Sequence, residues 1–131
     1  MTDQVRRQSD REKRLLELLG AVPEPGNPPS EFDLQALRER IDEIDRLILA
    51  LLNERSTAAN LIGRIKKVLG VPVYAPRREE EVLEQVRAAN CGPLPDRAVR
   101  HLFERIIDET RSLERKLSDA ESGSETERNA S

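Results

Sequence analysis

The chain is poor in aromatic residues: it contains no tryptophan, one tyrosine and two phenylalanines among 131 residues. A hydrophobic core must therefore be packed from Leu, Ile, Val and Ala. That composition suits helices better than a β-sandwich, which relies on aromatic and β-branched residues. The length fits one domain. These features predict an all-α protein.

Cysteine and histidine are also scarce, because Cys91 and His101 are the only residues of their kinds. A single cysteine excludes an internal disulfide, and the two residues together argue against a transition-metal site. The net charge of −3 does not suggest a nucleic-acid partner. No apolar run reaches membrane-spanning length, and the N-terminus lacks the apolar stretch of a signal peptide. We expect a soluble, cytoplasmic protein that needs no metal, nucleic acid or membrane.

The sequence divides into three parts. Residues 1–32 form an N-terminal extension, in which a leucine cluster predicts a short helix around Arg11 to Leu19, followed by a proline-rich linker. Residues 33–117 hold the periodic apolar pattern of a helical domain. Residues 118–131 carry a net charge of −3 and only alanine as apolar content, which predicts a disordered acidic tail.

A very long helix is predicted from Asp33, as its N-cap, to Leu69, where Gly70 and Pro72 stop it. Apolar residues recur along it in alternating steps of three and four, with Arg55 filling one gap. Such a helix would be roughly 55 Å long at ~1.5 Å per residue. A domain of this size is only about 30 Å across, so the helix must project beyond it. A partner chain would bury the apolar seam that is then left exposed.

Two further helices follow. The first is predicted to begin near Pro76, because proline is favoured at the first helical position, and to end near Asn90 or Gly92. The second is predicted to begin near Pro95 or Asp96, with an apolar seam that runs to Leu117. The expected architecture is therefore one very long helix, one short and one medium.

Arg55 occupies a core position of the long helix, where an unpaired guanidinium is costly to bury. It could set the register by pairing with an acid of another helix, or it could line a pocket for an anion. Lys66 lies eleven residues on, within about 20° of the same helical face, and this spacing favours a pocket for a multiply charged anion. Arg38 is about 26 Å from Arg55 along the helix and rotated by about 100°, so it cannot reach the same pocket within one chain. Its pattern favours a solvated arginine beside Glu39 and Asp42, and only a dimer could bring it to another chain's pocket.

Thr110 and Glu114 are four residues apart, so they share a face of the last helix. Glu114 could be a solvated flank or the partner of a buried cation. Glu79 belongs to an acidic run at a helix N-terminus, where acids are usually stabilising in their own right. Pattern alone does not single it out.

Three segments in this order and spacing resemble the all-helical chorismate mutase family: LQALRERIDEIDRLILALLNER, GRIKKVLGVPVYAPRREEEVL and HLFERIIDETRSLE. The resemblance covers residues 33–117. It implies an intertwined homodimer of three-helix chains whose two active sites are shared between the chains. It also implies conversion of the dianion chorismate to prephenate, on the route to phenylalanine and tyrosine. This Claisen rearrangement is unimolecular and needs no cofactor.

The resemblance assigns catalytic roles to Arg55, Lys66 and Glu114. Arg55 would grip a substrate carboxylate, and Lys66 would contact a carboxylate and the ether oxygen. Glu114 stands where many members carry a glutamine that donates a hydrogen bond to the ether oxygen, and others a glutamate. An ionised Glu cannot donate, so Glu114 would have to act as the neutral acid.

The resemblance also implies substrate-binding roles for other residues. Arg38 would cross from the partner chain, and Arg78 would lie near the site. Glu79 would receive the ring hydroxyl, and Thr110 would meet a carboxylate. Ala75 departs from the pattern, because some members carry an aspartate there, so that contact is lost or made by backbone.

Two other functions fit the same sequence. An isochorismate pyruvate-lyase shares the fold and the cationic pocket. A non-catalytic helical dimerisation module would form the same apolar seams, although the inward cations Arg55 and Lys66 argue against it. An assay with both substrates separates the mutase from the lyase, and alanine variants of Arg55 and Lys66 test the dimerisation module.

Overall fold

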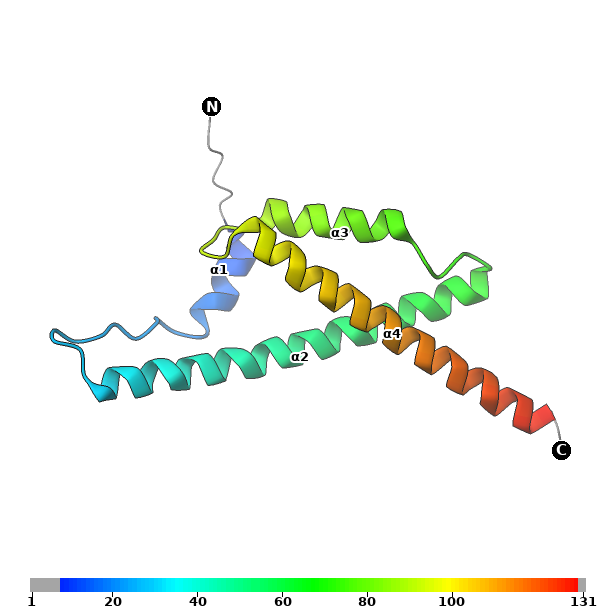
Figure 1. The fold of residues 1–131 in the computed structure, drawn as a ribbon, viewed down its shortest axis with the longest axis horizontal. Coiled ribbons are helices and arrows are strands. Elements are labelled where there is room, and N and C mark those ends of the chain that lie inside the picture. Colours follow the sequence, from blue (N-terminus) through cyan, green and yellow to red (C-terminus); the bar gives the residue numbers. More distant parts are fainter. Residues whose placement is uncertain (1–7, 130–131) are drawn as a thin grey trace, which may run out of the picture. The chain divides into compact units, whose positions relative to one another are not determined.

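The computed structural model describes residues 8–129, and within them the chain forms four α-helices and no strand. Figure 1 labels them α1 (Asp10–Glu17), α2 (Glu31–Leu69), α3 (Pro76–Ala89) and α4 (Asp96–Asn129). The predicted all-α class is confirmed. Helices α2, α3 and α4 begin near where the long, short and medium helices were predicted, but α4 has 34 residues and is longer than the medium helix expected. The short helix predicted in the extension is α1.

The described residues fall into two structural units. The first ends at Asn53 and contains α1 and the beginning of α2. The second starts at Glu54 and contains the rest of α2 together with α3 and α4.

In the first unit, α1 begins with a capping box. The Ser9 hydroxyl accepts the backbone N–H of Glu12, and the Glu12 carboxylate accepts that of Ser9. At the other end, the Arg40 guanidinium of α2 donates to the backbone carbonyls of Leu19 (2.6 Å) and Gly20 (2.9 Å). A cation there satisfies carbonyls left without helical partners, so Arg40 attaches the extension to α2.

The start of α2 differs from the prediction that Asp33 is its N-cap. The helix begins at Glu31, and the Asp33 carboxylate reaches back to accept the backbone N–H of Ser30 at 2.7 Å. An acid in the first helical turn can satisfy the donor of the capping residue, so Asp33 supports the N-terminus from inside the helix. These hydrogen bonds from the Ser30 and Gly26 backbone lower the pKa of the Asp33 carboxyl.

The end of α2 at Leu69 is as predicted. Gly70 adopts a φ of +70°, a left-handed conformation that glycine adopts without steric cost. The backbone N–H of Val71 then bonds to the carbonyl of Lys66 at 2.9 Å. This is the closing bond of a Schellman motif, and it turns the chain toward α3.

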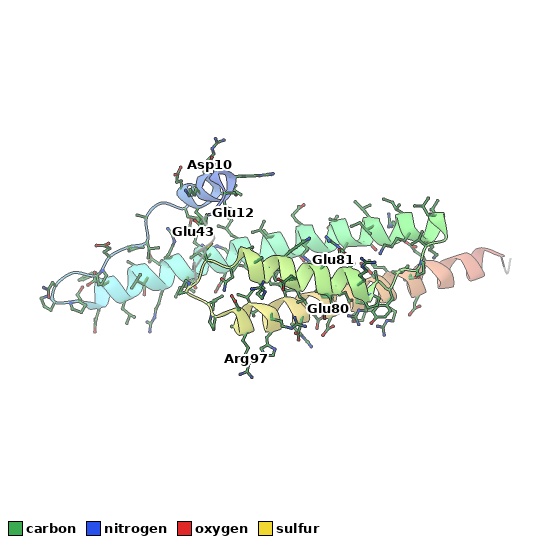
Figure 2. The ribbon with its side chains drawn as sticks, turned by 90° about the horizontal axis from the view of Figure 1, so that it is seen from above. Asp10, Glu12, Glu43, Glu80, Glu81 and Arg97 are labelled. Carbon is green, nitrogen blue, oxygen red and sulfur yellow. The ribbon has the colours of Figure 1, made fainter. Side chains whose placement is uncertain are left out.

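Helices α3 and α4 pack against each other and are joined by residues 90–95 (Figure 1). The Asn90 side chain organises this connection, since its amide group donates to the carbonyl of Leu94 (2.7 Å) and to Asp96 Oδ1 (2.9 Å). Glu80, labelled on α3 in Figure 2, pairs with Arg100 of α4 at 3.3 Å. Both helices begin where the prolines predicted.

The C-terminal segment contradicts the disorder predicted for residues 118–131, because α4 continues to Asn129; residues 130–131 lie outside the described part. The segment contains no proline. Its low apolar content limits packing but not the backbone hydrogen bonds that extend an existing helix. Glu121 of this extension also pairs with Arg64 of α2 at 3.5 Å.

The core of the second unit is small. Leu83, Val99 and Ile107 are its buried apolar residues, and Thr110 is a buried polar residue beside them. In contrast, the seam residues Ile62 and Ile65 of α2 are 54% and 57% exposed. No helix in the described residues is long and apolar enough to cross a membrane.

Candidate functional site

The second unit contains a cavity of about 760 Å³, lined by residues of α2, α3, α4 and the loop that joins α2 to α3. Six residues named above as site candidates, from their spacing or from the family resemblance, line this cavity: Arg55, Lys66, Arg78, Glu79, Thr110 and Glu114. Three helices that are separate in the sequence therefore bring these side chains to one place.

Arg55 is held by the last helix. Its Nη1 donates to the Thr110 hydroxyl oxygen at 3.1 Å, and that hydroxyl donates its proton to the Ile106 carbonyl at 2.8 Å. The hydroxyl thus acts as an acceptor toward the guanidinium and as a donor toward the backbone. Thr110 is 8% exposed. A buried hydroxyl with both bonding capacities used fixes the Arg55 side chain at the cavity wall.

Glu114 lies among the cations of the cavity. Burial raises the pKa of its carboxyl, while Lys66, Arg111 and Arg55 oppose the rise by favouring the anion. The carboxyl lies over Gly63 of α2, where an added Cβ would come 3.9 Å from the Glu114 Cδ. Burial is the larger effect, so the neutral acid persists to higher pH than in water.

Glu79 of α3 forms an ion pair with Arg111 of α4. The guanidinium Nε and Nη2 lie 3.0 Å and 2.7 Å from the same oxygen, Oε1. The Arg111 guanidinium also lies 5.2 Å from the centre of the Tyr74 ring, within the range of a cation–π contact. This ion pair links α3 to α4 across the cavity wall.

The remaining predicted residues have different surroundings. Arg78 lines the cavity and pairs weakly with Glu81, labelled on α3 in Figure 2, at 3.5 Å. Ala75 lines the cavity with a methyl group where an acid could have stood. Arg38 is exposed and belongs to the first unit, so it is not among the residues that the second unit brings together.

Sequence reasoning missed several lining residues of α4, of which Arg111 is the most connected. The signal was present, because Ile107, Arg111, Glu114 and Ser118 follow one another in steps of four, three and four and so share one helical face. Ser118 and its neighbour Asp119 belong to the segment predicted to be disordered, yet both line the cavity.

The arrangement suits a small organic anion. Arginine forks bind carboxylates at two points, and Lys66 adds a compact charge on the same wall. Among residues 8–129, no group of three or more His, Cys, Asp or Glu side chains is placed to hold a metal ion. The chemistry available from these side chains is the binding and orientation of an anion and the donation of hydrogen bonds or a proton.

The chain is similar to several known proteins. The family model described as chorismate mutase type II matches residues 37–115. A solved chorismate mutase structure from Thermus thermophilus is 45% identical, with a TM-score of 0.61, over 63% of this chain and 93% of that chain. The chorismate mutase of Methanocaldococcus jannaschii is 41% identical over 54 residues, 41% of this chain and 54% of that protein.

Longer relatives also match. The bifunctional chorismate mutase/prephenate dehydratase of Aquifex aeolicus is 40% identical over 89 residues, 65% of this chain and 25% of that protein. The protein of the same name from Neisseria gonorrhoeae is 45% identical over 80 residues, 61% of this chain and 22% of that protein. The matched region thus spans about a quarter of the length of these curated relatives.

Proposed function

Because this chain belongs to the chorismate mutase type II family, we propose that it rearranges chorismate to prephenate in the cavity of its second unit. The observation that carries the proposal is that one cavity is lined by the cations Arg55, Lys66 and Arg78 together with Glu114. Chorismate is a dianion with an enol-ether bridge. Its two carboxylates match a cavity lined by cations from three helices.

The reaction is unimolecular, so the protein needs to select a conformer and stabilise charge. Cations that hold both carboxylates bring the two reacting carbons together, which lowers the entropic part of the barrier. Negative charge develops on the ether oxygen as the C–O bond breaks. In this proposal, Lys66 and the neutral Glu114 acid supply the cation and the hydrogen-bond donor at that oxygen.

The other lining residues fix the substrate. Arg55, itself held by the Thr110 hydroxyl, binds a carboxylate. Arg78 adds a cation from α3, and Glu79 accepts a hydrogen bond from the ring hydroxyl. Ala75 stands where some family members carry an aspartate, so no acid at that position assists Glu79. The Glu79 carboxylate therefore recognises the substrate's ring hydroxyl without it.

We further propose an intertwined homodimer in which Arg38 of one chain completes the cavity of the other. The support is the apolar seam of α2, on which Ile48 is 48% and Leu51 is 68% exposed in the single chain. Contiguous apolar surface of this kind marks an interface. Arg38 is exposed on the same helix and is thereby available to a second copy.

The experiment that tests the activity follows the loss of chorismate absorbance and identifies prephenate as product, with isochorismate as a parallel substrate. We expect turnover of chorismate, and a loss of roughly 10²–10³ in kcat for Lys66→Ala. Formation of salicylate and pyruvate from isochorismate, with no prephenate, would instead identify a lyase. Dimerisation without turnover of either substrate would identify a dimerisation module.

Chain mixing tests the shared site. Arg38→Ala and Arg55→Ala homodimers should both be inactive, while their heterodimer should regain one intact site. Arg46→Ala provides the matched control, because Arg46 is another exposed arginine of α2 and should leave activity unchanged. Exchange of chains without recovery of activity would show that each site is built from one chain.

A further inference from the structure

Arg111 makes three contacts that the proposed function does not explain. Its side chain is 35% exposed, and it contacts Glu79 of α3, Asp108 of its own helix and the ring of Tyr74. The contact to Asp108, at 3.3 Å, is an ordinary pair along one helix face. The contact to Glu79 joins two helices and has a more specific geometry.

Both nitrogens that reach Glu79 go to one oxygen. Arg111 Nε and Nη2 lie 3.0 Å and 2.7 Å from Oε1. In the common fork arrangement, one nitrogen bonds to each oxygen and both oxygens of the carboxylate are occupied. Here both contacts go to Oε1 and restrain the direction of the carboxylate. The other oxygen, Oε2, retains its capacity to accept a hydrogen bond.

The Tyr74 ring restrains the guanidinium from another side. The loop between α2 and α3 carries this ring, which lies 5.2 Å from the Arg111 Cζ. A guanidinium stacked on an aromatic face and bonded through its edge has little rotational freedom. Residues of the α2–α3 loop, α3 and α4 therefore together restrain the orientation of the Glu79 carboxylate.

We propose that Arg111 is a positioning residue that orients the Glu79 carboxylate toward the substrate's ring hydroxyl and cancels its charge in a site built for a dianion. The inference rests on the proposed function, in which Glu79 is the acceptor of that hydroxyl. An uncompensated carboxylate beside a bound dianion would repel it. With Arg111 beside it, the Glu79 carboxylate can bind the substrate's hydroxyl without repelling the substrate's two carboxylates.

Arg111 also acts on a second acid of the cavity. It opposes the rise in the pKa of Glu114, as do Lys66 and Arg55 from α2. The other charged lining residues are Arg78 and Glu79 from α3, and Arg115 and Asp119 from α4. Removal of the Arg111 charge should therefore raise the pKa of Glu114. If kcat/KM declines with rising pH because Glu114 ionises, that decline should move to higher pH.

The test compares Arg111→Ala, Arg111→Lys and Arg105→Ala for kcat, KM and the pH dependence of kcat/KM with chorismate. Arg105 is the matched control, because it lies on α4 and pairs with Glu109 at 2.6 Å on an exposed face. For Arg111→Ala we expect kcat/KM to fall roughly 10- to 100-fold, mainly through KM, as for loss of a hydrogen bond to a charged group. Arg105→Ala should match the wild type.

The lysine variant separates charge from geometry. Arg111→Lys should keep the alkaline decline where the wild type has it, because the charge remains, and still lose affinity, because one ammonium group cannot reproduce the two bonds to Oε1. Arg111→Ala should move the decline to higher pH. A merely structural role would change Tm without shifting the pH profile. Thermal melts of each variant monitor folding.

A double-mutant cycle identifies the partner. If Arg111 acts through Glu79, the loss in Arg111→Ala/Glu79→Gln should be close to that of Glu79→Gln alone. Additive losses, or an Arg111→Ala variant as active as Arg105→Ala, would overturn the positioning role while leaving the proposed function intact. A wild-type chain that fails to convert chorismate would overturn both.

Discussion

Replacement of Glu114 by glutamine should change how the reaction rate depends on pH. In the proposed mechanism Glu114 donates a hydrogen bond to the ether oxygen, so only its neutral form is active. Burial raises the pKa of this carboxyl above its ordinary value of 4.5, against the pull of Lys66, Arg111 and Arg55. Catalytic efficiency should therefore decline as the pH rises through the raised pKa.

The size of the decline follows from a single ionisation. Above the folded pKa the neutral fraction falls tenfold for each pH unit, equivalent to about 1.4 kcal/mol of lost transition-state stabilisation per unit. Glu114→Gln supplies a permanent donor of similar shape in the space above Gly63, so it should stay active and flatten the profile. Glu114→Ala removes the donor and should cost roughly 2–4 kcal/mol at every pH.

The same shift links Glu114 to stability, with a defined sign. A folded-state pKa above the unfolded value means that the folded chain binds this proton more tightly. The stabilisation is fully present below the unfolded pKa and is lost as the pH rises through the folded pKa. Glu114→Gln should remove this contribution to the pH dependence, which thermal melts across that window measure.

The assay is kcat/KM for chorismate over the pH range in which the protein stays folded, with the wild type, Glu114→Gln and Glu114→Ala compared. A glutamine variant as inactive as the alanine variant would refute the role of Glu114 as hydrogen-bond donor. A glutamine variant that keeps the wild-type decline would refute it equally, because the titrating group would then be another residue.

Three further predictions concern packing and the C-terminal segment. Thr110→Val should raise KM, since the Arg55 guanidinium loses its acceptor, and it should cost about 1–3 kcal/mol of stability, measured by chemical denaturation. Leu83→Ala should destabilise the fold by about 2–5 kcal/mol in the same measurement, because Leu83 is 5% exposed in the small core. Truncation after Leu117 should change KM for chorismate because it removes two lining residues of the cavity, whereas truncation after Glu121 should leave KM unchanged.

The sequence predicted the helices where local signals are strong. Gly70 ends α2 and Pro76 begins α3, because each residue has a backbone preference that acts without tertiary context. The predicted end of α4 was wrong, because low apolar content affects packing but not the backbone hydrogen bonds of a helix already formed. The N-cap of α2 lies three residues before the predicted Asp33 for a related reason, since an acid can support a helix start from several positions of the first turn.

The candidate site was predictable to a similar degree. Arg55 and Lys66 share a helix face by spacing alone, and the structure places both at the cavity. Arg111 was missed because its significance lies in Glu79, 32 residues earlier and on another helix. Periodicity along one helix carries no information about which side chain of a second helix it will meet.

The connection organised by Asn90 has a consequence for how the chain folds. Helices α3 and α4 are adjacent in sequence and pack against each other, so their contacts close only a short loop. Contacts of low sequence separation form fast, on a timescale far shorter than long-range docking. The α3–α4 hairpin should therefore already be ordered in the folding transition state. Loss of the Asn90 bonds to Leu94 and Asp96 should accordingly slow folding more than it speeds unfolding.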